Sequence, residues 1–93
     1  MRKFEIVSFY SNQDINLPKR ATKYSAGYDI ESAKDYEILP GQIQMIDTGL
    51  KVMMPDQEAL MIYPRSSLGI KKGLTMSNAV GIIDKDYYNN PNN

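Results

Sequence analysis

Short stretches of alternating or continuous hydrophobic residues, separated by turn signals, dominate this chain and are typical of β-strands. Residues 3–9 alternate polar and apolar side chains, as a half-buried strand does. The turn signals recur every ~8–12 residues, which favours a sandwich or barrel over a βαβ fold. We predict an all-β fold with 59–63, the most apolar run, as a central strand. The other expected strands are 28–30, 43–46, 50–53 and 79–83.

Three other segments have distinct local signals. Residues 12–23 are polar, contain Pro18 and predict an extended connection. Residues 39–42 place proline and glycine at the two central positions of a type II turn. Between residues 64 and 73, Ser66 is suited to an N-cap and Gly73 to the position after the last helical turn. We therefore expect one or two helical turns after Arg65.

Composition limits the size and the partners of the protein. Ninety-three residues form one small domain, residues 1–93, that buries about 60–65% of its unfolded surface. Eleven basic residues balance 11 acidic ones, which argues against a nucleic-acid or membrane partner held by bulk charge. No apolar run approaches the ~20 residues of a membrane span, and the N-terminus lacks a signal-peptide pattern. Together with the absence of cysteine, these features predict a cytoplasmic location.

The absence of histidine and cysteine limits the possible chemistry. Zinc sites built on these residues, Ser-His-Asp triads and imidazole acid–base catalysis are all excluded. Any catalysis must therefore use carboxylates, hydroxyls, tyrosine, lysine or arginine.

A first candidate cluster follows the apolar run 79–83. Asp84 and Asp86 flank Lys85, and Tyr87 comes next. A carboxylate beside an aromatic ring at the end of a strand can activate a water next to a flat ligand. The alternative is a solvated turn closing two core strands. Gly81 marks a bulge or a close approach to the backbone.

A second cluster is formed by Arg65, Ser66 and Ser67, and a third by Asp29 after a small-residue turn. An arginine and two hydroxyls at a helix N-terminus predict a phosphate site. The alternative is that Ser66 only caps the helix and Arg65 is a surface residue. Asp29 alone is typical of a turn, but phosphates generally bring Mg²⁺, which binds one or two carboxylates and retains waters.

These clusters resemble a known family. The order and separation of three segments are similar to the first three of five motifs of the trimeric dUTPases, over residues 21–87. The segments are Ala26-Gly27-Tyr28-Asp29-Ile30, Pro64-Arg65-Ser66-Ser67-Leu68-Gly69 and Gly81-Ile82-Ile83-Asp84-Lys85-Asp86-Tyr87. The resemblance implies a jelly-roll-like homotrimer with active sites at subunit boundaries. It also implies Mg²⁺-dependent hydrolysis of dUTP to dUMP and pyrophosphate, which cleans the nucleotide pool and supplies dUMP for thymidylate synthesis.

The resemblance also assigns roles to individual residues. It implies that Asp84 is the catalytic carboxylate that orients and deprotonates the attacking water, and that Asp29 holds Mg²⁺ through water. Tyr87 is expected to pack on the deoxyribose. Asn78 and the backbone near Gly81 are expected to read uracil. The triphosphate ligands implied are Arg65, Ser66 and Ser67.

The chain departs from the family pattern after Tyr87. Many members follow this tyrosine with one residue and a glycine, whereas here residues 88–93 read Tyr-Asn-Asn-Pro-Asn-Asn. The fourth motif, with its glutamine, and the glycine-rich fifth motif are missing. We therefore expect the N-terminal portion of a longer protein, with an incomplete core, exposed strand edges and little or no activity by itself.

Two other functions remain open. One is a dCTP deaminase of the same superfamily, although its pattern has a Pro-Gly-Trp-like sequence where this chain has Lys85-Asp86-Tyr87. The other is a nucleotide-gated module in which the dUTPase scaffold binds a regulatory protein partner.

Overall fold

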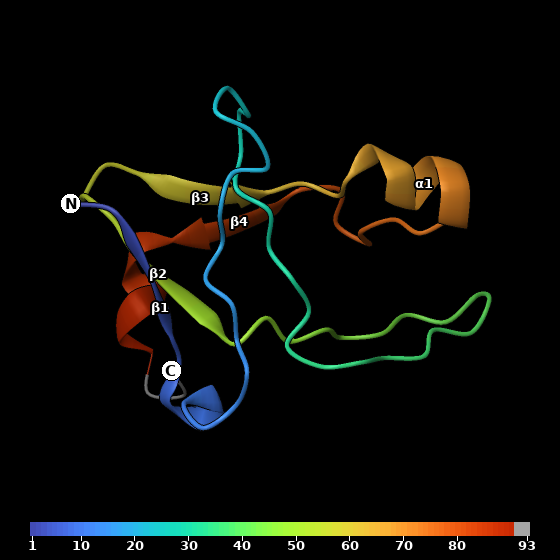
Figure 1. Ribbon diagram of the computed structural model, residues 1–93, viewed down its shortest axis with the longest axis horizontal. Helices are drawn as coiled ribbons and strands as arrows, with labels where there is room; N and C mark the ends of the chain where they lie inside the picture. Colours follow the sequence, from blue (N-terminus) through green and yellow to red (C-terminus); the bar gives the residue numbers. More distant parts are fainter. Residues whose placement is uncertain (91–93) are drawn as a thin grey trace.

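The computed structural model describes residues 1–90, which form two separate antiparallel ribbons and one short α-helix (Figure 1). In the first ribbon, Lys3 lies opposite Met53 and Ile6 opposite Leu50. The predicted mostly-β architecture with one helix after Arg65 is confirmed. The strands are β1 (Lys3–Ile6), β2 (Leu50–Met53), β3 (Ala59–Ile62) and β4 (Gly81–Asp84), and the helix is α1 (Ser66–Lys72).

The buried core lies along the β1–β2 ribbon and at its two ends. Its hydrophobic members within residues 1–90 are Val7, Tyr10, Val52 and Met54. The predicted strand 3–9 ends early, at Ile6, because the 3-10 turn η1 (Ser8–Tyr10) takes over there. This turn directs Tyr10 into the core and leaves Phe9 77% exposed. The strand prediction was therefore wrong for its last three residues.

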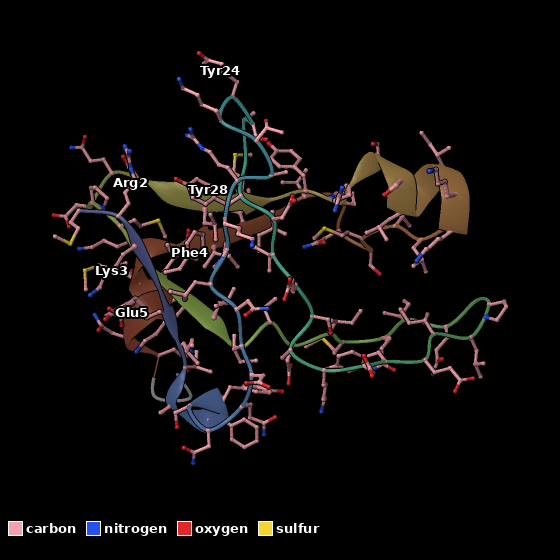
Figure 2. The ribbon with its side chains drawn as sticks, in the orientation of Figure 1. Arg2, Lys3, Phe4, Glu5, Tyr24 and Tyr28 are labelled. Atoms are coloured by element: carbon pink, nitrogen blue, oxygen red, sulfur yellow. The ribbon has the colours of Figure 1, made fainter. Side chains whose placement is uncertain are left out.

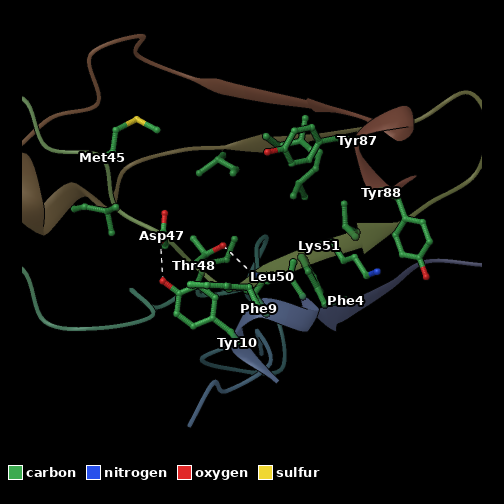
Figure 3. A pocket seen from close by; sticks show the side chains of 18 residues that line it. Phe4, Phe9, Tyr10, Met45, Asp47, Thr48, Leu50, Lys51, Tyr87 and Tyr88 are labelled. Carbon is green, nitrogen blue, oxygen red and sulfur yellow. Dashed lines mark hydrogen bonds between the residues drawn. The ribbon is translucent and has the colours of Figure 1, made fainter. Parts of the chain in front are cut away.

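A hydrogen-bonded junction fixes Tyr10 against the segment that enters β2. The Tyr10 hydroxyl donates to Asp47 Oδ2 at 2.8 Å, and this bond is the main cause that raises the pKa of Tyr10 to about 12 (Figure 3). Gly49 has φ +73°, and a Cβ there would lie 3.3 Å from Tyr10 Cγ and 3.2 Å from Ile15. A side chain at position 49 would therefore meet both backbone strain and this packing.

The second ribbon joins β3 and β4, with Ile62 opposite Gly81 and Ala59 opposite Asp84. The prediction that 59–63 forms a central strand is wrong, because within residues 1–90 β3 pairs with β4 alone. Met61 and Ile82 are therefore 50% and 62% exposed. This agrees with the expected incomplete core and exposed strand edges.

Helix α1 begins and ends differently from what Ser66 and Gly73 suggested. Arg65, with extended backbone (φ −70°, ψ 144°), is the N-cap, so the prediction of Ser66 as N-cap is wrong. Gly73 ends the helix as expected, in the left-handed region at φ 63°, and its N–H donates to the Leu68 carbonyl.

Two expected strands, 28–30 and 43–46, are not strands in the structure. Asp29 makes one isolated antiparallel bridge with Lys19, and 43–46 belongs to a projecting loop with Ile43 81% exposed (Figure 1). No neighbouring strand within residues 1–90 supplies either segment with a ladder. The turn at 39–42 is confirmed, since Gln42 N donates to the Leu39 carbonyl at 3.0 Å and Gly41 has φ +78°.

Side chains of β1 contact two other parts of the chain, the segment around Tyr28 and the segment that follows β4. Phe4 faces Tyr28 with ring centroids 6.1 Å apart (Figure 2). After β4 the chain forms the 3-10 turn η2 (Lys85–Asn89), at the place where a solvated turn was the alternative in the sequence analysis. Tyr88 of this turn donates to Glu5 at 2.7 Å, and Lys51 Nζ lies 4.6 Å from the centre of the Tyr88 ring.

Across residues 1–90 no helix is both long and apolar enough for a membrane crossing.

Candidate functional site

An open cavity of about 1550 Å³ lies at the end of the β3–β4 ribbon where α1 begins. Three of the predicted site residues, Asp29, Arg65 and Asn78, contribute to its wall. Arg65 Nη1 lies 4.0 Å from Asp29 Oδ2, and their side chains are 70% and 47% exposed. The structure thus brings together the second and third sequence clusters, a cation and an anion facing the same open space.

Local hydrogen bonds fix the backbone of both residues. Asp29 N donates to the Lys19 carbonyl at 2.9 Å, and the Arg65 carbonyl accepts from Leu68 N at 3.0 Å. The first bond belongs to the isolated bridge and the second to the first turn of α1. Exposed side chains on anchored backbone can change partners without moving the chain.

Ser66 and Ser67 occupy the first turn of α1, directly after Arg65. Ser66 is exposed and Ser67 is half-buried. Both lie at the same end of the β3–β4 ribbon as the Asp29–Arg65 pair, because α1 follows β3 after three residues. Their assignment as triphosphate ligands stays a prediction.

Asn78 and Gly81 lie in and after the turn that leads into β4. Val80 N donates to the Asn78 carbonyl at 2.7 Å, and Ala79 has φ 63°. A Cβ at Gly81 would lie 3.4 Å from Met76 Cε and 3.6 Å from Ile62 Cβ. The close approach expected at Gly81 is thus made by neighbouring side chains of the same chain. Ala79 and Met76 were not identified from the sequence. No sequence signal indicates that an alanine has left-handed backbone or that a methionine side chain packs against a glycine.

Asp84 and Tyr87 lie at the other end of the ribbon. Asp84 is exposed as the last residue of β4, opposite Ala59. The next residue, Lys85, is hydrogen-bonded to Asp56, which raises the pKa of Lys85 and lowers the pKa of Asp56. Sequence reasoning missed Asp56, which belongs to a turn without any motif. This contact ties the segment after Asp84 to the turn that precedes β3.

Tyr87 faces a second cavity, of about 510 Å³, between the two ribbons (Figure 3). Its side chain is 51% exposed. Apolar residues from both ribbons share this wall, among them Phe4, Leu60 and Ile83. The expected packing of Tyr87 on a sugar stays a prediction.

The predicted site residues therefore form two groups at opposite ends of the β3–β4 ribbon (Figure 1). Gly81 and Asp84 are three positions apart along the strand, about 10 Å, and Arg65 lies beyond the Gly81 end. Within a single chain, the Asp84 carboxylate and the Arg65 guanidinium therefore lie at opposite ends of this ribbon.

The Asp29 carboxylate suits a hydrated Mg²⁺ ion. The described part of the chain, residues 1–90, has no cluster of three His, Cys, Asp or Glu residues that could form a complete metal cage. Mg²⁺ usually keeps several waters and binds one or two carboxylates together with substrate phosphates. Asp29 and Glu31 are both exposed carboxylates that line this open cavity, which fits that mode of binding.

Comparison with known proteins agrees with the three motifs. A family model described as dUTPase matches residues 13–91. The deoxyuridine 5'-triphosphate nucleotidohydrolase of Lactococcus lactis subsp. lactis (strain IL1403) is 56% identical over 93 residues, which are 100% of this chain and 62% of that protein. The enzyme of the same name from Rickettsia typhi is 47% identical over 74 residues, 77% of this chain and 50% of that protein.

A solved structure shows the same similarity. The crystal structure of dUTPase from Streptococcus mutans matches with a TM-score of 0.88 and 48% identity, over 97% of this chain and 70% of that chain. The present chain thus spans less than two thirds of the two curated relatives. Since the family model covers most of its residues, this chain belongs to the dUTPase family.

Proposed function

We propose that the protein of which this chain forms a part hydrolyses dUTP to dUMP and pyrophosphate. The observation that carries the proposal is the meeting of Asp29 and Arg65 at one open cavity, with oppositely charged side chains 4.0 Å apart. The similarity to curated dUTP nucleotidohydrolases supports the same reaction.

Arg65, Ser66 and Ser67 bind the triphosphate in this proposal. The guanidinium can grip phosphate oxygens with two parallel hydrogen bonds, and its 70% exposed side chain is accessible to a ligand in the cavity. The serine hydroxyls, on the first turn of α1, donate to neighbouring oxygens. Asp29 would hold Mg²⁺ through water, and the ion when bound would neutralise part of the triphosphate charge.

The base and the sugar are recognised by the turn before β4 and by Tyr87. The backbone around Asn78 and Gly81 presents donors and acceptors to the uracil edge. At C4, uracil has a carbonyl acceptor whereas cytosine has an amino donor. Cytosine in a site built for uracil would therefore leave a buried polar group unpaired, which costs about 1–3 kcal/mol. The ring of Tyr87 packs on the deoxyribose and leaves no space for a ribose 2′-hydroxyl.

Asp84 orients the attacking water and accepts its proton. The water oxygen forms a bond to phosphorus while the α–β phosphoanhydride breaks, and pyrophosphate leaves. General-base catalysis of this kind contributes about 10²–10⁴-fold. Positioning and neutralisation of charge supply most of the remaining rate.

We further propose that Asp84 and Arg65 of one site come from different subunits of a homotrimer. The two residues lie at opposite ends of the β3–β4 ribbon within a chain, so a neighbouring subunit would bring them together. This arrangement is supported by the geometry of one chain and by family resemblance.

Product analysis with dUTP and Mg²⁺ tests the proposal. We expect pyrophosphate and dUMP in equal amounts from the full-length protein, with dCTP a poor substrate and EDTA abolishing turnover. Ammonia release from dCTP would instead indicate a deaminase, and tight dUTP binding without turnover would indicate a regulatory module. The 93-residue chain by itself should show little or no turnover.

A further inference from the structure

The contact between Asp29 and Arg65 has properties of a pair that exchanges partners. At 4.0 Å between Nη1 and Oδ2, the two charges attract without a direct hydrogen bond. Exposed ion pairs of this kind favour the paired over the separated arrangement by about two- to fivefold. The pair is therefore strong enough to orient Arg65 and weak enough to be displaced by a polyanion.

Both backbones stay anchored when the side chains separate. Asp29 is held by its bridge to Lys19, and Arg65 by the first turn of α1. The bond to Leu68 and the bridge use main-chain atoms, so neither depends on the ion pair. Both carboxylate and guanidinium open onto the cavity that we assign to the triphosphate.

We propose that Asp29 is a positioning residue for Arg65 in addition to its assigned role toward Mg²⁺. Without nucleotide, the carboxylate holds the guanidinium at the cavity wall. When a hydrated divalent cation takes the carboxylate, Arg65 is released to the triphosphate. This inference rests on the proposed function, and it makes cation and nucleotide binding cooperative through a single ion pair.

The proposal predicts opposite effects of one substitution under two conditions. With EDTA present, Asp29→Asn removes the competitor for Arg65, and the full-length protein should bind a non-hydrolysable dUTP analogue about two- to fivefold more tightly. With Mg²⁺ present, the same variant should bind more weakly than wild type. Asp35→Asn, an exposed change outside the cavity, controls for general charge effects.

A double-mutant cycle separates the ion pair from simple charge repulsion. If Asp29 acts through Arg65, the gain in affinity that Asp29→Asn causes in EDTA should vanish in an Arg65→Gln background. A gain that persists in this background would show that Asp29 merely repels the triphosphate, and would overturn the proposal. Equal weakening by Asp29→Asn in EDTA and in Mg²⁺ would overturn it as well.

A second readout needs no nucleotide. In NMR spectra of the nucleotide-free protein, Asp29→Asn should shift the Arg65 Nε–H resonance, because the ion pair forms without nucleotide. An unchanged resonance would overturn the ion-pair exchange even where nucleotide binding and turnover are normal. Failure of the wild type to bind the analogue in Mg²⁺, with the resonance shift intact, would instead count against the proposed function.

Discussion

Asp84 and Arg65 lie at opposite ends of the β3–β4 ribbon. The register fixes this relationship, because Asp84 pairs with Ala59 at the start of β3, whereas Arg65 follows Ile62 at its end. Local backbone geometry thus separates the carboxylate that we propose activates water from the guanidinium that we propose binds phosphate. A second subunit is the simplest way to unite them.

Met54 is expected to be important for stability, since it is one of the buried hydrophobic side chains of the described core. Met54→Ala should lower the free energy of unfolding by about 2–5 kcal/mol through lost burial and a new cavity. Met45→Ala, at a position 84% exposed, is the matched control and should change it by about 0.5 kcal/mol or less. An equal loss of unfolding free energy for both variants in urea titrations would contradict the burial of Met54 in the core.

Tyr10 should make stability fall at alkaline pH. Its pKa is raised to about 12 by the hydrogen bond to Asp47, above the usual value near 10. The folded state therefore favours the protonated phenol, so the stability that it contributes is complete below pH ~10 and is lost as the pH rises toward 12. The urea midpoint of wild type should drop more between pH 9 and pH 12 than that of Tyr10→Phe. Parallel curves would show that the bond does not form.

Backbone conformation at Gly73 and Ala79 gives a paired prediction. Both have φ 63°, but Gly73 suits this region and Ala79 does not. Gly73→Ala should destabilise by about 1–2 kcal/mol through strain alone, since nothing lies within 4 Å of the added Cβ. Ala79→Gly should be neutral or stabilising by up to about 1 kcal/mol, because relief of strain offsets added chain entropy. A loss of stability in Ala79→Gly would mean that the turn is not strained.

Asp84 and Asp86 differ in their expected roles although both are exposed carboxylates, two positions apart in the same segment. In the full-length protein, Asp84→Asn should lower kcat for dUTP by about 10²–10⁴-fold with little change in nucleotide binding. Asp86→Asn should retain most of the activity, because Asp86 lies in the 3-10 turn η2 and has no role in the proposed reaction. The assignment of the base is wrong if Asp86→Asn is the more damaging change.

Some local signals in the sequence predicted the local structure correctly. Gly73 ended its helix, and Pro40 and Gly41 formed their type II turn, because each conformation depends on a few neighbouring residues. The segment 43–46 had a strand pattern and no ladder, since a strand needs a partner that residues 1–90 do not supply. The same reason explains why β3, the most apolar run, is not central.

The candidate site was predictable in its residue types but not in its geometry. Three motifs identified Asp29, Arg65 and Asp84, yet only the structure showed that the first two meet and that the third lies elsewhere. Contacts such as Lys85 with Asp56 depend on register and side-chain direction, for which no local signal exists.

Subunit complementation tests the proposed shared site most directly. Asp84→Asn chains and Arg65→Ala chains of the full-length protein, each inactive by itself, would be unfolded, mixed in equal amounts and refolded together. If each site takes Asp84 and Arg65 from different subunits of a cyclic trimer, mixed trimers contain one intact site each, and about a quarter of wild-type activity should return. If activity stays at the level of the separate variants although mixed trimers have formed, one chain supplies both residues and the shared site is wrong.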